Sequence, residues 1–156
     1  MAEPTLFSDR EAALLDALVS GSVDFLVVGL GAAALQGAPA VTQDIDLWFG
    51  DLTDPRLHNA LRQVGASYIP PTHTTPPLLA GAGAELFDIV VHMHGLGTFR
   101  QEARRAIKVT VGRIEVPVLP LARIIASKKA TGRPKDLAIL PVLEDALRVS
   151  RRRRQS

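Results

Sequence analysis

The sequence predicts an α/β domain in which a small mixed β-sheet is flanked by helices. Short apolar segments typical of strands alternate along the chain with segments that carry helix-capping residues and apolar residues at helical spacing. Two strand patterns separated by a Gly-Arg pair add an antiparallel hairpin. With 156 residues, of which 47% are apolar, the chain is long enough for one buried core.

The segment up to residue 64 contains clear helix start and stop signals. Ser8 and Glu11 form a predicted capping box for a first helix that ends near Gly21. Asp54 and Pro55 are typical of the N-cap and first turn of a later helix. Between these helices we expect a strand over residues 25–29, a short helix over residues 31–37 and a strand over residues 43–49.

The second half begins with a stretch rich in Pro, Thr and Gly, residues 70–83, which predicts a surface loop without a regular element. A strand is expected over residues 84–92, and Thr98 opens a helical segment. The hairpin strands are residues 107–111 and 114–118. Two helices follow, over residues 121–130 and from residue 134 to about residue 149.

Positive charge is concentrated at the C-terminus. The net charge is +2, from 18 Lys and Arg against 16 Asp and Glu, and removing Arg151 to Arg154 leaves 14 minus 16, or −2. We therefore expect one slightly acidic domain over residues 1–150 and a basic tail over residues 151–156. A frayed, solvated tail is the favoured interpretation, and attraction of RNA by the Arg run is the alternative.

The absence of cysteine excludes disulfides, thiolate zinc sites and cysteine nucleophiles. The first residues, MAEPTLFSDRE, have no signal-peptide pattern, and no apolar run approaches the roughly 20 residues that span a bilayer. We therefore expect a cytoplasmic protein without a membrane partner.

Two aspartates are the strongest functional lead. Asp44 and Asp46 alternate with apolar residues, which places both carboxylates on the same face of the predicted strand. Magnesium prefers oxygen ligands, usually one or two carboxylates together with water and substrate phosphates. The alternative is a pair of acids that are simply hydrated at a strand end.

The context of this pair resembles the active-site signature of the nucleotidyltransferase superfamily with a DNA polymerase beta-like fold. Residues 27–49, VVGLGAAALQGAPAVTQDIDLWF, contain a strand ending in a glycine turn, a short helix and a second strand with Asp-x-Asp. Gly29 matches the first turn position, whereas Leu30 replaces the second Gly or Ser and Gly31 follows it. The resemblance implies that Asp44 and Asp46 bind metal and that the turn approaches the triphosphate.

The resemblance also implies a third carboxylate on a neighbouring strand, and Asp88 is the candidate. In the superfamily this acid helps to bind the metal and accepts the proton of the attacking hydroxyl. A strand-end Asp that makes only a local turn is the alternative. Asp88 could also combine with His92 and His94 in a transition-metal site, but this requires the strand to continue through Met93.

Residues 116–147 resemble the C-terminal part of small bacterial nucleotidyltransferases, including those related to toxin-antitoxin systems. Lys128, Arg133, Lys135 and Asp136 match the family pattern of a helix ending in Lys and a Gly-Arg-x-Lys-Asp turn. Lys and Arg can neutralise the charge that develops on a triphosphate. Alternatively, the basic residues are solvated and Asp136 caps the last helix.

Together the resemblance implies a magnesium-dependent transfer of a nucleoside monophosphate from an NTP, such as ATP, to an acceptor hydroxyl, with release of pyrophosphate. Two metal ions could take part, and Mn²⁺ could substitute for Mg²⁺. The acceptor could be tRNA, a protein or a small molecule, and the loop of residues 70–83 is the candidate for selecting it. The second hypothesis is a non-catalytic nucleotide-binding or antitoxin-like interaction module on the same fold.

A competing pattern is the dinucleotide-binding G-x-G-x-x-A, formed by Gly29, Gly31 and Ala34. Two features argue against it. The helix before Gly37 has room for only about two turns, and dinucleotide-binding units use a longer crossover helix. The acids also lie at the start of the next strand instead of beyond its apolar residues.

Overall fold

Five strands form a mixed sheet in a computed structural model that describes residues 7–40 and 42–155. They are β1 (Phe25–Val28), β2 (Ile45–Phe49), β5 (Phe87–Val90), β6 (Ile107–Val111) and β7 (Ile114–Val118). Their order across the sheet is β5-β2-β1-β7-β6, and the sheet contains both parallel and antiparallel pairs. The predicted fold class, a small mixed sheet flanked by helices, is confirmed.

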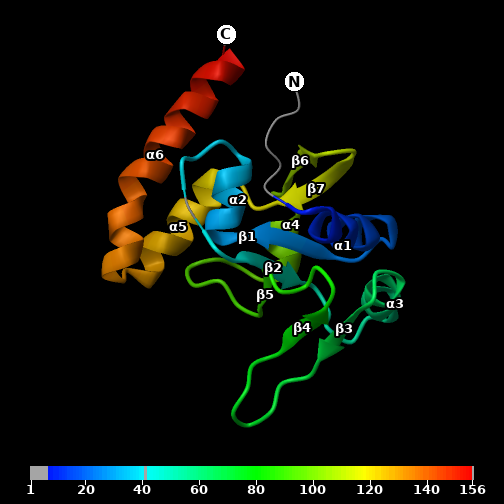
Figure 1. The fold of residues 1–156 in the computed structure, drawn as a ribbon. Coiled ribbons are helices and arrows are strands. Elements are labelled where there is room, and N and C mark those ends of the chain that lie inside the picture. The colour runs from blue at the N-terminus through cyan, green and yellow to red at the C-terminus, as the bar shows by residue number, and fades with distance from the viewer. Residues whose placement is uncertain (1–6, 41, 156) are drawn as a thin grey trace.

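The described residues also form six helices, which surround the sheet (Figure 1). They are α1 (Asp9–Ser20), α2 (Gly29–Leu35), α3 (Pro55–Gln63), α4 (Phe99–Ala103), α5 (Leu121–Thr131) and α6 (Pro134–Gln155). α2 packs on β1 and β2, α5 packs on α2, and α6 packs on α5, so three helices are layered outward from the sheet. None of the helices in the described part of the chain has the length and apolar character needed to cross a membrane.

Local sequence signals account for most element boundaries. Ser8 makes the predicted capping box with Glu11 at the start of α1, and Asp54 caps α3 by accepting from the Arg56 N–H. The predicted hairpin of β6 and β7 is confirmed with both of its residue ranges. Thr98 and Gln101 form a second capping box at the start of α4.

The stretch predicted as an irregular loop contains a strand, so this prediction was wrong in part. β3 (Ala66–Ile69) and β4 (Leu78–Gly81) pair antiparallel in a separate two-stranded sheet. Gly81 ends β4 with a φ of 105°, and a Cβ there would lie 2.4 Å from the Gly65 carbonyl oxygen. The loop is therefore confined to residues 70–77, at the end of a hairpin that projects from the body in Figure 1.

The last helix also exceeds its predicted length. α6 continues beyond residue 149 through the Arg run to Gln155, so the segment expected as a frayed tail is helical. Arg is a good helix former, and positive charge is favourable near a helix C-terminus. No Gly or Pro after residue 149 would end the helix.

The side chain of Gln36 connects α2 to α5. Its Nε2 donates to the Ala32 carbonyl at 3.0 Å and to the Leu119 carbonyl at 2.8 Å, and its Oε1 accepts from the Leu121 N–H at 3.0 Å. Because Leu121 begins α5, one amide side chain satisfies backbone groups at the end of α2 and at the start of α5.

A buried ion pair joins α4 to α5. Glu102 is 2% exposed and accepts from Arg123 at 2.8 and 2.9 Å, and the Gly97 N–H donates to it at 2.9 Å. Hydrogen bonding from Arg123 holds the pKa of Glu102 below its ordinary value. The pair therefore contributes stability that is present above the pKa of an unfolded Glu and is lost as the pH falls through the lower folded-state value.

We expect Arg123→Met to reduce the free energy of unfolding by about 3 kcal/mol at neutral pH, because it leaves a buried carboxylate without its cation. Urea denaturation followed by circular dichroism measures this change. The Glu102→Gln/Arg123→Met double variant removes both charges and should recover part of the loss. Equal stability of the single variant and the wild type would contradict the prediction.

Candidate functional site: an acidic and basic cleft

Three acidic side chains meet beside the ends of two neighbouring strands. Asp46 lies in β2 and Asp88 in β5, and these parallel strands place the two residues in register, directly opposite each other. Asp44 immediately precedes β2. All three line one cleft of about 270 Å³. The parallel register therefore brings together the acids that the sequence predicted as one group.

Basic residues from the α5–α6 region complete the cleft. Lys128 lies in the last turn of α5, Arg133 precedes α6, and Lys135 and Asp136 lie in its first turn. The cleft is lined by Leu30, Thr42, Asp44, Asp46, Asp88, Lys128, Arg133, Lys135, Asp136 and Ile139. Of the predicted site residues, only Gly29 and Gly31 are absent from this lining, and both pack directly behind it.

The two glycines allow β2 to approach the turn closely. Gly29 has a φ of 65°, and a Cβ on it would lie 2.7 Å from Oδ2 of Asp46. A Cβ on Gly31 would lie 2.7 Å from Cδ1 of Ile45. Any side chain at either position would displace the strand that carries the acids. The glycine pattern thus has a steric reason: it keeps the backbone of the turn against Asp46.

Two acids of the cleft, Asp46 and Asp88, resist ionisation. Burial raises the pKa of Asp46 above its ordinary value, the charges of Asp88 and Asp44 raise it further, and Lys128 partly opposes the shift. Burial also raises the pKa of Asp88, with Asp44 adding to the effect. Among the described residues, no side chain forms a hydrogen bond or ion pair with these three carboxylates. Their negative charge is therefore poorly compensated within the described chain.

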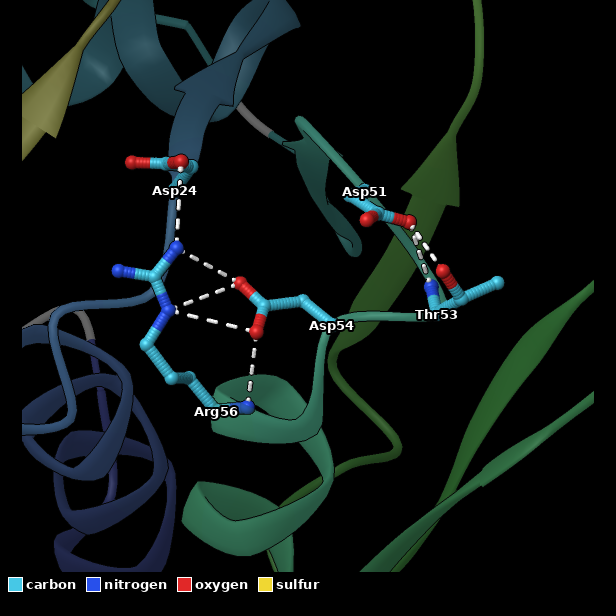
Figure 2. Close-up of polar contacts among 5 residues, drawn as sticks. All are labelled: Asp24, Asp51, Thr53, Asp54 and Arg56. Atoms are coloured by element: carbon cyan, nitrogen blue, oxygen red, sulfur yellow. Dashed lines mark hydrogen bonds and ion pairs between the residues drawn. The ribbon is translucent and has the colours of Figure 1, made fainter.

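A second group of acids, at the opposite end of β1 and β2, differs because its carboxylates have hydrogen-bond partners (Figure 2). There Asp54 pairs with Arg56 at 2.9 Å, and Asp51 accepts from the backbone and hydroxyl of Thr53. These hydrogen bonds lower the pKa of Asp54 and of Asp51. This group lines a hollow of about 810 Å³, but its acids cap and pair locally. The cleft of Asp44, Asp46 and Asp88 differs in that none of its three carboxylates has a side-chain partner among the described residues, and Asp46 is half-buried.

Asp136 anchors two of the basic residues. It is 1% exposed and accepts from Lys128 Nζ at 3.2 Å and from Arg133 Nε at 2.7 Å. Hydrogen bonding from Arg133, supported by Lys128, lowers the pKa of Asp136 to about 2. The sequence indicated a helix cap that pairs locally; its burial and its bond to Lys128, eight residues away, depend on how α5 packs on α6.

The donors of the cleft fit magnesium by their chemistry. They are carboxylate oxygens without competing partners among the described residues, and Mg²⁺ typically takes one or two carboxylates and completes its shell with water and phosphate oxygens. Within residues 7–40 and 42–155, no three His, Cys, Asp or Glu side chains form a group that could hold a metal ion alone. A cation held by these carboxylates would take its remaining oxygen ligands from water or from a bound phosphate.

The histidine alternative finds no support in the described residues. β5 ends at Val90, so the strand does not continue through Met93 as that hypothesis requires. The rings of His92 and His94 pack edge to face with centroids 5.1 Å apart, and neither residue lines the cleft. The described chain lacks the third ligand that would join them in a metal site.

The sheet topology also excludes the dinucleotide-binding hypothesis. In that unit the two strands are parallel and joined by a long crossover helix. Here β1 and β2 are antiparallel, and α2 spans only residues 29–35.

Comparison with solved structures identifies the fold. ANT(2″)-Ia in complex with adenylyl-2″-tobramycin aligns over 91% of this chain and 95% of its own, with 16% identity and a TM-score of 0.58. A solution structure of ANT(2″)-Ia, an antibiotic-resistance factor, aligns over 94% of this chain and 89% of its own, with 14% identity and a TM-score of 0.57. An antigenic nucleotidyltransferase-like protein from Paracoccidioides brasiliensis aligns over 90% of this chain and 78% of its own, with 16% identity and a TM-score of 0.52.

These similarities establish a nucleotidyltransferase fold, as the sequence resemblance predicted. ANT(2″)-Ia, the protein in two of the three structures, is an aminoglycoside nucleotidyltransferase. No protein-family model and no curated protein matches the chain.

We expect Asp46→Asn to stabilise the protein at neutral pH when magnesium is absent, because it removes a carboxylate whose ionisation the fold opposes. As the pH falls through the raised pKa, wild-type Asp46 takes up a proton and the difference should shrink. Millimolar MgCl₂ with ATP should raise the Tm of the wild type more than that of the variant. Thermal unfolding across pH measures both effects, and a variant less stable than wild type without metal would contradict the prediction.

We expect Asp136→Asn to weaken nucleotide binding, because Lys128 and Arg133 lose the carboxylate that orients them. The Kd for ATP with magnesium, measured by calorimetry, should rise by about tenfold, equivalent to about 1.4 kcal/mol. Lys129→Gln, which breaks only the exposed 3.6 Å contact with Glu144, is the matched control. An unchanged Kd in a correctly folded Asp136→Asn protein would contradict the anchoring role.

Proposed function

We propose that this chain is a nucleotidyltransferase that moves a nucleoside monophosphate from an NTP to an acceptor hydroxyl and releases pyrophosphate. The observation that carries the proposal is the register pairing of Asp46 with Asp88 in a cleft that also contains Lys128. This arrangement offers poorly compensated carboxylates for a cation and a lysine for phosphate, within a fold shared with nucleotidyltransferases.

Asp44, Asp46 and Asp88 would hold magnesium, in a site for one or two ions that Mn²⁺ could also occupy. When bound, the metal would neutralise phosphate charge and help to orient the triphosphate. The raised pKa values of Asp46 and Asp88 support this assignment, because a divalent cation supplies the positive charge that the described chain does not place on them.

The chain's own residues supply alignment and proton transfer. Lys128, Arg133 and Lys135 would bind the β- and γ-phosphates and stabilise the negative charge on the departing pyrophosphate. The acceptor oxygen forms a bond to the α-phosphorus, and the bond from that phosphorus to the β-phosphate oxygen breaks. Asp88 accepts the hydroxyl proton, and its raised pKa suits a general base. The backbone of Gly29, Leu30 and Gly31 forms the wall of the cleft beside the triphosphate.

The decisive test replaces the acids singly with Asn. We expect Asp44→Asn and Asp46→Asn to reduce magnesium-dependent incorporation of label from [α-³²P]ATP into lysate acceptors by at least about 100-fold, with little change in fold. Asp24→Asn is the charge-matched control, since Asp24 is an exposed acid at the opposite end of β1. Full activity in both cleft variants would refute the proposal.

Leu30 supports a second candidate, a non-catalytic nucleotide-binding or antitoxin-like interaction module. It occupies the turn position where the superfamily has Gly or Ser, and its side chain lines the cleft. Calorimetric titration with ATP and magnesium, followed by a pyrophosphate assay, separates the two candidates. Binding without pyrophosphate release across RNA, protein and small-molecule acceptors would favour the module, which would act as a cytoplasmic partner protein.

A further inference from the structure

In the described part of the chain, no strand pairs with the outer edge of β6. The five-stranded sheet ends at β5 on one side, where β4 packs against it, and at β6 on the other, where β7 is the strand in extensive contact. Figure 1 shows the β6–β7 hairpin on the side of the sheet away from β5. The outer edge of a strand presents N–H and C=O groups that can pair with another chain.

The hairpin turn determines which backbone groups of β6 point outward. Gly112 has a φ of 61° at the first central position of a two-residue loop, as in a type II′ turn. In such a hairpin the closing pair of residues exchanges hydrogen bonds, and every second pair along the ladder does the same. The N–H and C=O groups of Lys108 and Thr110 therefore point away from β7. Pro117 agrees with this alternation, because it lies opposite Lys108 in a pair that needs no N–H between the strands.

The side chains of β6 alternate between apolar and polar residues. Val109 and Val111 pack against the core, and Ile107, on the same face of the strand, is 39% exposed. Lys108 and Thr110 lie on the other face and are exposed. A strand added at this edge would match β6 best if it alternated apolar residues with acidic residues.

Basic side chains flank the edge. From Arg104 to Arg113 the chain contains four basic residues and no acid, although the chain without its Arg run has a net charge of −2. Arg104 and Lys108 lie within about 14 Å of each other, because only four residues separate them, and Arg113 lies in the turn at the far end of β6. These three residues are exposed and form no ion pair or side-chain hydrogen bond with another described residue. The fourth, Arg105, interacts with Glu102.

The backbone of the edge favours a polypeptide over a nucleic acid. The outward groups of Lys108 and Thr110 include both donors and acceptors, whereas the oxygens of a phosphate chain only accept hydrogen bonds. A second copy of β6 would satisfy both kinds of group but would bring the basic residues of two chains together, which is unfavourable. An extended acidic segment satisfies the backbone and complements the charge.

We propose that β6 is a docking edge for an extended acidic segment of a partner protein, which adds to the sheet as a further strand. Main-chain hydrogen bonds to Lys108 and Thr110 hold the segment, and its carboxylates lie beside Lys108 and Arg113. This surface is separate from the cleft, because β1 and β7 lie between β2 and β6. Docking is therefore measured without nucleotide or metal, and its outcome does not depend on the proposed function.

The binding test uses the full chain and a fluorescein-labelled peptide, Asp-Val-Glu-Val-Asp-Val-Glu. We expect saturable binding by fluorescence anisotropy that weakens as KCl is added, because the flanking charges are exposed. A peptide with Asn and Gln in place of its acids should bind at least about fivefold more weakly. A peptide with N-methylated backbone amides keeps its charge but cannot donate to the edge, and it should not bind.

Substitutions in the chain separate backbone pairing from charge. Thr110→Pro removes an outward N–H without breaking a bond between β6 and β7, and it should weaken peptide binding by at least about tenfold. Thr110→Val keeps the N–H and should bind like the wild type. Lys108→Gln/Arg113→Gln should weaken binding by about fivefold, whereas Arg151→Gln/Arg152→Gln removes the same charge from α6 and should leave the Kd unchanged at physiological salt. Circular dichroism verifies that each variant is folded.

Amide hydrogen exchange by NMR locates the bound peptide. In the free chain the amides of Lys108 and Thr110 should exchange rapidly, and the peptide should slow them. The amides of Val109 and Val111 bond to β7 and should be protected with and without peptide.

Three outcomes would overturn the inference. One is the absence of saturable peptide binding up to millimolar protein, and another is equal binding of the N-methylated peptide, which would show diffuse charge attraction without strand pairing. The third is occupation of the edge by something else. Slowed exchange at Lys108 and Thr110 on adding a single-stranded oligoribonucleotide, or a concentration-dependent dimer that Thr110→Pro dissociates, would assign the edge to RNA or to a second copy.

Discussion

Electrostatic repulsion between two carboxylates that the backbone holds together is the constraint on which the cleft depends. Burial is the largest cause of the raised pKa of Asp46, and the neighbouring charge of Asp88 raises it further. The β2–β5 ladder prevents Asp46 and Asp88 from separating, because Ile45 and Leu47 on either side of Asp46 are buried in the core. The apolar core thus supplies the free energy that maintains this local repulsion.

Attraction between opposite charges organises the basic half of the cleft. Asp136 gives Lys128 and Arg133 a buried carboxylate to bind when no phosphate is present. Without it, Lys128 would be free to move toward Asp46 and neutralise the acids directly, since the two charges already interact. Asp136 therefore holds Lys128 and Arg133 on the α5–α6 side of the cleft, away from the carboxylates of the sheet.

Features set by neighbouring residues could be predicted from the sequence, and features set by long-range packing could not. The spacing of Asp44 and Asp46, the Ser8 capping box and the hairpin around Gly112 are all local. The pairing of β3 with β4 was missed because proline and glycine around β4 resemble a loop, although Gly81 is required for close approach to Gly65. That Asp88 lies opposite Asp46, rather than merely near it, depends on the order of the strands.

The amide of Gln36 has a consequence for how the two halves of the cleft are held together. The acids lie in β2, in β5 and just before β2, whereas Lys128, Arg133 and Asp136 belong to the α5–α6 region. Gln36 follows α2, which packs on β1 and β2, and its hydrogen bonds to Leu119 and Leu121 connect this layer to the start of α5. The acidic and basic halves are thus joined through a residue that lines neither.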